Sequence, residues 1–168
     1  SLYANRIEAL SQGSEAPPGT SNAGAVLPPV RSKQYEAGAK VDFGQYAVTA
    51  SLFQIERPAA GTDPRTNTYG LTGEQRNRGV EFGVFGEPVS GVRMLGGATY
   101  TQGTLTRTAN GVNEGNTAPG VPKLQVNLGG EYDVAAVPGL ALNARAVHTS
   151  SQYYDAENVR SIPSWTRF

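Results

Sequence analysis

The sequence predicts an all-β protein with the fold class of an antiparallel up-and-down transmembrane β-barrel. Three observations lead to this class: apolar residues recur with a period of two in several stretches, 21 glycines and 11 prolines provide frequent turns, and long and short connections alternate between the stretches. Helical periodicity is sustained nowhere. No apolar run approaches the ~18 residues of a membrane helix, so a helical membrane protein is excluded.

The composition narrows the possible partners. The 14 basic residues balance the 14 acidic ones, so the chain has no electrostatic field strong enough to recruit nucleic acid or anionic lipid. Cysteine is absent, which excludes a disulfide framework and a thiolate metal site. The hydrophobic fraction of 38% is low for a helical or α/β core.

The prolines divide the chain into its expected strands, because proline cannot donate to a β-ladder and is expected outside or at the margins of strands. Seven strands and the start of an eighth are expected at 2–10, 33–43, 46–56, 74–86, 92–106, 122–133 and 140–149, with the last beginning at Ser164.

The strand at 33–43 shows the division of faces most clearly. One side carries apolar residues: Tyr35, Ala37, Ala39, Val41 and Phe43. The other side carries polar or small residues: Gln34, Glu36, Gly38, Lys40 and Asp42. A barrel wall has this pattern, with its apolar side toward lipid. Tyr35 and Phe43 lie about 20 Å apart along the barrel axis after tilt, close to the ~25 Å lipid band, so both are expected in the aromatic girdles.

The strand at 46–56 follows a two-residue turn, so Phe43 should lie opposite Tyr46. Its outward residues are then Tyr46, Val48, Ala50 and Leu52. Phe53 and Ile55 point inward, which leaves two interpretations. Either they pack against something in the lumen, or a bulge shifts the register.

The strand at 74–86 lies in the stretch "GEQRNRGVEFGVFGEP", residues 73–88, and presents Val80, Phe82 and Val84 to lipid. Arg76 and Arg78 share this parity, so without a bulge at Gly79 they point outward at the level of the outer-leaflet head groups. They could contact lipopolysaccharide phosphate, since guanidinium binds phosphate bidentately, or they could be solvated rim charges. The alternation recurs at 122–133.

The connections also favour a membrane barrel. Those at 11–32, 57–73, 107–121 and 150–163 are long and polar, whereas Gly44–Gln45, "EPVSG" and "VAAVPG" are short. Membrane barrels have long extracellular loops and short periplasmic turns, and a soluble sandwich has no reason to sort its loops in this way. The segments 11–32 and 107–121 are expected to be the most mobile. A passive porin-like barrel and a soluble β-sandwich binding module remain as alternatives.

Three segments resemble a known family. "SKQYEAGAKVDF", "GEQRNRGVEFGVFG" and "SIPSWTRF" are similar to segments in the C-terminal half of the barrel of TonB-dependent siderophore receptors. The resemblance implies a bacterial outer-membrane importer of ferric siderophores, energised through TonB, with a plug inside a barrel of about 22 strands. Residues 1–168 would then form part of a single barrel domain, with the plug, the signal peptide, the TonB contact and the closing strand outside this chain.

The resemblance also implies functional residues. Glu36 and Glu81 match positions where the wall meets arginines of the plug. Aromatic and cationic side chains near the loops are candidates for contact with the ferric siderophore, through stacking and charge, or are ordinary loop side chains: Arg65, Tyr69, Arg107, Tyr153, Tyr154 and Arg160.

Catalysis is not expected. His148 is the only histidine and has no neighbouring carboxylate in sequence to orient it, so an interfacial or loop-base role is favoured over that of a catalytic base. No Gly-rich phosphate loop and no calcium-loop spacing are present. The chain is therefore expected to be no enzyme and to carry no cofactor and no bound metal, with the ferric siderophore as a transported ligand.

Overall fold

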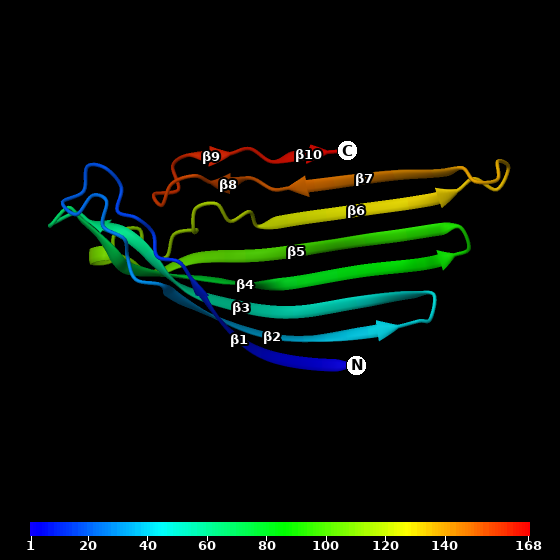
Figure 1. Ribbon diagram of the computed structural model, residues 1–168, viewed down its shortest axis with the longest axis horizontal. Coiled ribbons are helices and arrows are strands. Elements are labelled where there is room, and N and C mark those ends of the chain that lie inside the picture. Colours follow the sequence, from blue (N-terminus) through cyan, green and yellow to red (C-terminus); the bar gives the residue numbers. More distant parts are fainter.

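A computed structural model describes residues 1–168 as a single-layered antiparallel sheet of eight strands in the order β1-β2-β3-β4-β5-β6-β7-β10 (Figure 1). The strands are β1 Leu2–Ser11, β2 Val30–Asp42, β3 Tyr46–Asp63, β4 Thr68–Val89, β5 Val92–Arg107, β6 Leu124–Asp133, β7 Ala141–Thr149 and β10 Trp165–Arg167. A short 3₁₀ turn, η1 Ala109–Gly111, follows β5, and a small hairpin pairs β8 Gln152–Tyr153 with β9 Ser161–Ile162. No helix is long and apolar enough to span a membrane.

From β1 to β7 each strand pairs with the next one along the chain, and β7 pairs with β10 after the β8–β9 hairpin, which gives the expected up-and-down topology. The register places Ala37 opposite Leu52, Leu52 opposite Val80, and Val80 opposite Tyr100. Because side chains alternate between the faces of a strand, this register unites the apolar residues of β2 to β5 on one face. The predicted division of faces is confirmed.

The sheet has no core of its own. Only 9 of the 168 residues are buried, and Leu52 and Leu128 on the apolar face are 63% and 55% exposed. A β-sandwich would cover such residues with a second sheet, but the other sheet here is only the two-stranded β8–β9 hairpin, so that alternative is wrong. The sheet is open, with β1 and β10 at its edges.

The aromatic residues around the first short turn lie as expected. The Phe43 N–H donates to the Tyr46 carbonyl over 2.9 Å, and the two rings stack with centroids 4.8 Å apart. Phe53 does face inward, because the β3–β4 register is continuous from Tyr46 to Ala59. Its ring covers Gly79 on the facing strand, where an added Cβ would lie 2.9 Å from Phe53 Cζ.

The predicted loop at 57–73 is wrong. β3 continues to Asp63 and β4 begins at Thr68, so the connection consists of residues 64–67 only. A bulge between Ala59 and Gly61 shifts the register within this extension. Pro58 therefore lies inside β3, next to a bulge, which is one of the positions where a strand tolerates proline. The long end of this hairpin projects as a paired ribbon.

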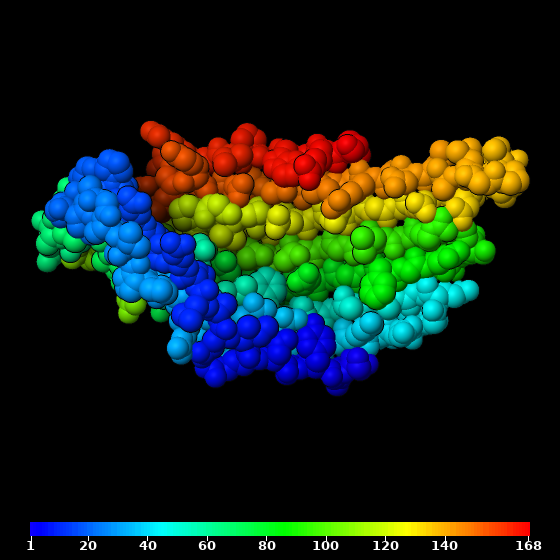
Figure 2. Space-filling model, in the orientation of Figure 1, coloured from blue at the N-terminus to red at the C-terminus, as the bar shows by residue number.

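Two long connections fold onto neighbouring segments. The loop 12–29 packs against the β3–β4 tip, where Asn22 exchanges hydrogen bonds of 2.8 and 2.9 Å with the backbone of Tyr69. Figure 2 shows this loop, in blue, gathered with the hairpin tip at one end of the molecule. The segment after β5 binds the β8–β9 hairpin, because Asn158 bonds both the N–H and the carbonyl of Thr117.

Candidate functional site

Two carboxylates lie on the polar face of the wall. Glu36 of β2 lies opposite Phe53 of β3, and Glu81 of β4 lies opposite Ser51 of β3. Phe53 and Ser51 are two residues apart on the same strand, so they point to the same side of the sheet. Both glutamates therefore point to that side as well. Tyr3 Oη donates to Glu36 Oε1 over 2.7 Å, and Gln34 Nε2 donates to Glu36 Oε2 over 3.1 Å. Neither glutamate forms an ion pair within the chain.

The contact between Tyr3 and Glu36 depends on a glycine. Tyr3 lies opposite Gly38, and an added Cβ at Gly38 would be 2.7 Å from the Tyr3 ring. The ring therefore crosses the bare backbone and brings its hydroxyl to the carboxylate two residues away. Sequence reasoning missed Tyr3, although a tyrosine on the strand that precedes the QYE segment was a visible signal.

A second polar group lies higher on the same face. Arg57 Nη2 donates to Gln75 Oε1 over 2.9 Å, and Gln75 Nε2 donates to Asn77 Oδ1 over 2.9 Å. Gln75 is only 4% exposed and still has both ends of its amide bonded. This cross-strand chain was not identified from sequence, because the loop expected at 57–73 hid the pairing of Arg57 with Gln75.

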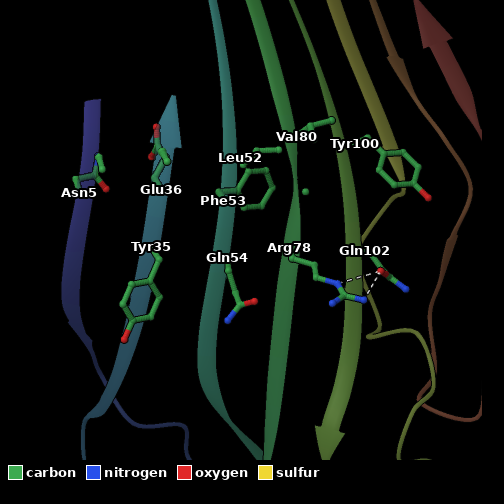
Figure 3. Close-up of a pocket in the computed structure, with 13 residues that line it drawn as sticks. Asn5, Tyr35, Glu36, Leu52, Phe53, Gln54, Arg78, Val80, Tyr100 and Gln102 are labelled. Carbon is green, nitrogen blue, oxygen red and sulfur yellow. Dashed lines mark hydrogen bonds between the residues drawn. The ribbon is translucent and has the colours of Figure 1, made fainter. Parts of the chain in front are cut away.

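Arg76 and Arg78 lie on the apolar face, as their parity predicted. The register is continuous at Gly79 on both sides of β4, so no bulge turns them inward. Arg78 donates through Nε and Nη2 to Gln102 Oε1 of β5, over 3.2 and 3.1 Å (Figure 3). Neither arginine forms an ion pair with a carboxylate of the chain. Sequence reasoning did not identify Gln102.

The six loop candidates divide into two groups. Arg65, Tyr69 and Arg107 lie around the β3–β4 tip and at the end of β5, and Tyr153, Tyr154 and Arg160 lie in or beside the β8–β9 hairpin. Within the second group the Tyr154 N–H donates to the Arg160 carbonyl over 3.0 Å. Tyr154 is 66% exposed, so its ring is open to a ligand.

Asp63 organises the tip of the long hairpin. Its Oδ1 accepts the Arg65 backbone N–H over 2.8 Å and the Asn110 amide over 3.1 Å, which ties η1 to β3. The hydrogen bond from Arg65 is the largest cause that holds the pKa of the Asp63 carboxyl below its ordinary value. The carboxylate is thus the ionised acceptor that fixes the turn.

His148 lies on β7, where its Nδ1 is 2.8 Å from Thr166 Oγ1 of β10. The two residues are cross-strand partners in the sheet. No cluster of three or more His, Cys, Asp or Glu side chains with the geometry of a metal site is present. The contact of His148 joins two strands of the sheet, and no carboxylate is hydrogen-bonded to its imidazole.

Comparison with known proteins gives a family match over the entire chain. Residues 1–168 match the family described as TonB dependent receptor-like, beta-barrel. The chain is 46% identical over 172 aligned residues to the ferrichrome receptor FcuA of Yersinia enterocolitica, covering 99% of this chain and 23% of that protein. It is 30% identical over 149 residues to the ferrichrome outer membrane transporter/phage receptor of Escherichia coli, covering 85% and 20%.

Solved structures agree in shape. BauA, the ferric preacinetobactin receptor of Acinetobacter baumannii, superposes with a TM-score of 0.80 at 45% identity, over 98% of this chain and 26% of that one. The siderophore receptor PiuA from the same species has a TM-score of 0.80 at 26% identity, over 99% and 26%.

The chain belongs to the TonB-dependent receptor β-barrel family, whose members are bacterial outer-membrane proteins. It spans about a quarter of the length of the relatives it matches. The apolar face of the sheet is therefore the lipid-facing side of a barrel wall, and the polar face with Glu36 and Glu81 is the lumenal side.

Proposed function

We propose that this chain forms wall and extracellular loops of an outer-membrane receptor that binds a ferric siderophore and imports it with energy supplied through TonB. The observation that carries the proposal is the match of all residues 1–168 to the receptor barrel family, together with 46% identity to a ferrichrome receptor and 45% to a ferric preacinetobactin receptor. In this function the chain positions and contacts its partners and catalyses no reaction.

The plug domain is the proposed partner of the lumenal carboxylates. Glu36 and Glu81 face the lumen together and find no cation within the chain. Tyr3 and Gln34 donate neutral hydrogen bonds to Glu36, which orient its carboxylate without neutralising it. Arginines of a plug would supply the missing charge through bidentate, charge-assisted hydrogen bonds.

The extracellular end is the proposed site of first contact with the siderophore. Arg65, Arg107 and Arg160 provide charge and Tyr69, Tyr153 and Tyr154 provide rings, on segments that the loop contacts hold in place. Cationic and aromatic side chains suit a polar or anionic ferric complex with apolar edges. The fixed loops would lower the entropy lost on binding.

Uptake of radiolabelled iron tests the function. The receptor that contains this chain is expressed in cells lacking their own siderophore receptors and is offered ferrichrome and ferric preacinetobactin as separate probes. We expect energy-dependent uptake of a ferric siderophore that stops when TonB is deleted. Uptake that persists without TonB, at a rate proportional to concentration, would indicate a passive pore and contradict the proposal.

A further inference from the structure

The segment that follows β5 contains the only Asn-Gly pair of the sequence, Asn110–Gly111. The pair lies in the 3₁₀ turn η1, outside the barrel wall, and both residues are exposed. Both have positive φ angles, 56° for Asn110 and 73° for Gly111. A Cβ added at Gly111 would meet no atom within 4 Å, so the turn has open space around it.

An asparagine side chain can react with the backbone that follows it, which is one reason why asparagine is a thermolabile residue. The backbone nitrogen of the next residue forms a bond to Cγ, the bond between Cγ and Nδ2 breaks, and ammonia leaves with the proton of that backbone N–H. The remaining ring is a succinimide, and one water molecule opens it to aspartate or to isoaspartate. Glycine favours the attack, because no side chain crowds its nitrogen and its backbone rotates freely.

Only two long hydrogen bonds hold the reacting groups of this pair. The Gly111 N–H, which carries the attacking nitrogen, donates to the Thr108 carbonyl over 3.3 Å. Asn110 Nδ2, the leaving nitrogen, donates to Asp63 Oδ1 over 3.1 Å. Both bonds are longer than the usual length of about 2.9–3.0 Å, so they open at low cost. Rotation about the ψ angle of Asn110, which is 21° in the turn, then brings the nitrogen to Cγ.

Asn158 has the same backbone conformation as Asn110, with a φ of 59°, but its amide is held at both ends. Its Oδ1 accepts the Thr117 N–H over 2.8 Å, and its Nδ2 donates to the Thr117 carbonyl over 2.9 Å. The next residue is Val159, whose branched side chain crowds the nitrogen that would attack. Asn158 is therefore the internal control for Asn110.

We propose that Asn110 is a site of spontaneous deamidation, in which the Gly111 nitrogen displaces ammonia and water opens the ring, and that the product releases η1 from the β3–β4 hairpin. The bond from Asn110 to Asp63 is the one hydrogen bond between η1 and β3. A carboxylate at position 110 has no proton to donate and lies beside the Asp63 carboxylate, so repulsion replaces the bond. The reaction requires neither siderophore nor plug.

The chemical test uses the complete receptor, purified in detergent and kept in mildly alkaline buffer made with heavy-oxygen water. Mass spectrometry of its peptides over time should show that position 110 loses its amide nitrogen and gains one heavy oxygen, while Asn158 keeps its amide. Isoaspartate should form together with aspartate, because only opening of the succinimide ring gives both. Gly111→Ala should slow the conversion severalfold, and heat-modifiable gel mobility shows that this variant has a folded barrel.

The structural consequence is tested with Asn110→Asp, which introduces the charge of the product and keeps a residue type that tolerates positive φ. Cleavage within residues 108–115 by a protease of broad specificity should become severalfold faster than in the unchanged receptor. Asn110→Asp combined with Asp63→Asn exchanges donor and acceptor. The amide at position 63 can then donate to the carboxylate at 110 and still accept the Arg65 N–H, so the double variant should recover the original cleavage rate.

The deamidation site is overturned if position 110 keeps its amide, if it forms aspartate without isoaspartate, or if Asn158 or the Gly111→Ala variant converts at the same rate. The release of η1 is overturned if Asn110→Asp is cleaved no faster than the unchanged receptor, or if the double variant is cleaved as fast as Asn110→Asp, because the contact with Asp63 would then not hold the turn.

Discussion

Glu36 and Glu81 together test the lumenal role at the scale of single residues. We expect Glu36→Ala combined with Glu81→Ala, in the complete receptor, to loosen the plug, because removing one side of a partly desolvated ion pair costs about 3 kcal/mol. The measurement is sensitivity to large antibiotics and detergents, which should rise, while siderophore affinity changes less. Glu56→Ala on the outward face is the control. An unaltered barrier and transport rate in the double variant would show that the two carboxylates do not dock the plug.

Gly79 is required by the close packing of its neighbours. A Cβ at this position would lie 2.0 Å from the Tyr100 carbonyl oxygen and 2.9 Å from Phe53 Cζ. We therefore expect Gly79→Ala to destabilise the folded receptor by about 1–3 kcal/mol, the usual range for overpacking. Urea unfolding in detergent measures the change. Gly129→Ala is the control, because its nearest contact would be an ordinary 3.6 Å to the Leu95 carbonyl oxygen, and an equal loss in both variants would contradict the steric explanation.

The face of the sheet to which each side chain points was predictable from the sequence, because side chains alternate between the two faces along a strand and the short turns fix which residues of adjacent strands lie opposite each other. Val80, Arg78 and Glu81 all lie on the sides that parity assigned. The partners of these residues were not predictable in the same way. Gln102 meets Arg78, and Tyr3 meets Glu36, only because the stagger between strands places them opposite or diagonal to each other, and stagger depends on cross-strand packing that no single strand encodes.

The tip of the β3–β4 hairpin is expected to respond to pH at the scale of an element. The folded pKa of Asp63 lies below the ordinary 3.8, chiefly because the Arg65 N–H donates to its carboxylate. A lowered folded pKa means that the stabilisation is complete above 3.8 and is lost as the pH falls through the lower folded value. Hydrogen exchange of the Arg65 amide, corrected for intrinsic rates, should show protection at pH 5 that declines below pH 3.8. If Asp63→Asn showed the same pH profile, the Asp63 carboxylate would not be the source of the pH dependence.

The loop 12–29 is expected to be held by Asn22. Its amide exchanges two hydrogen bonds with the backbone of Tyr69, so Asn22→Ala should release the loop from the hairpin tip. Limited proteolysis of intact cells should then cut this loop severalfold faster than in the unchanged receptor. Asn113→Ala, which removes a longer 3.4 Å bond to Glu157 in the other loop group, serves as the control. If Asn22→Ala leaves the cleavage rate unchanged, other contacts hold the loop.

Element boundaries were predictable within the membrane and not above it. The strands expected at 33–43 and 92–106 differ from β2 and β5 by a few residues at most. The segment 57–73 was misassigned because Pro58, Pro64 and several Gly and Thr residues are typical of a loop, whereas pairing between Pro58 and Glu74 and the bulge after Ala59 extend the hairpin. The β8–β9 hairpin was missed for a similar reason, since two-residue strands leave no periodic pattern.

At the scale of the whole molecule, the structure is a curved wall and not a self-contained globule. With 9 of 168 residues buried, its stability must come from strand pairing and from what lies against its two faces. We propose that lipid lies against the side of Leu52 and Val80, and that plug or water lies against the side of Glu36 and Glu81. Every hypothesis about residues on either face depends on this assignment of the two faces.

Single-cysteine labelling along β4 tests this assignment most directly. The chain contains no cysteine, so Val80, Glu81, Phe82, Gly83, Val84 and Phe85 can each be replaced by cysteine in a receptor made cysteine-free elsewhere. Spin labels are attached and their collision rates with oxygen, which partitions into lipid, are compared with those of a water-soluble nickel complex. Labels at 80, 82 and 84 should favour oxygen, and labels at 81, 83 and 85 should not. Equal accessibility at all six positions, or the opposite alternation, would contradict a barrel wall with this facing.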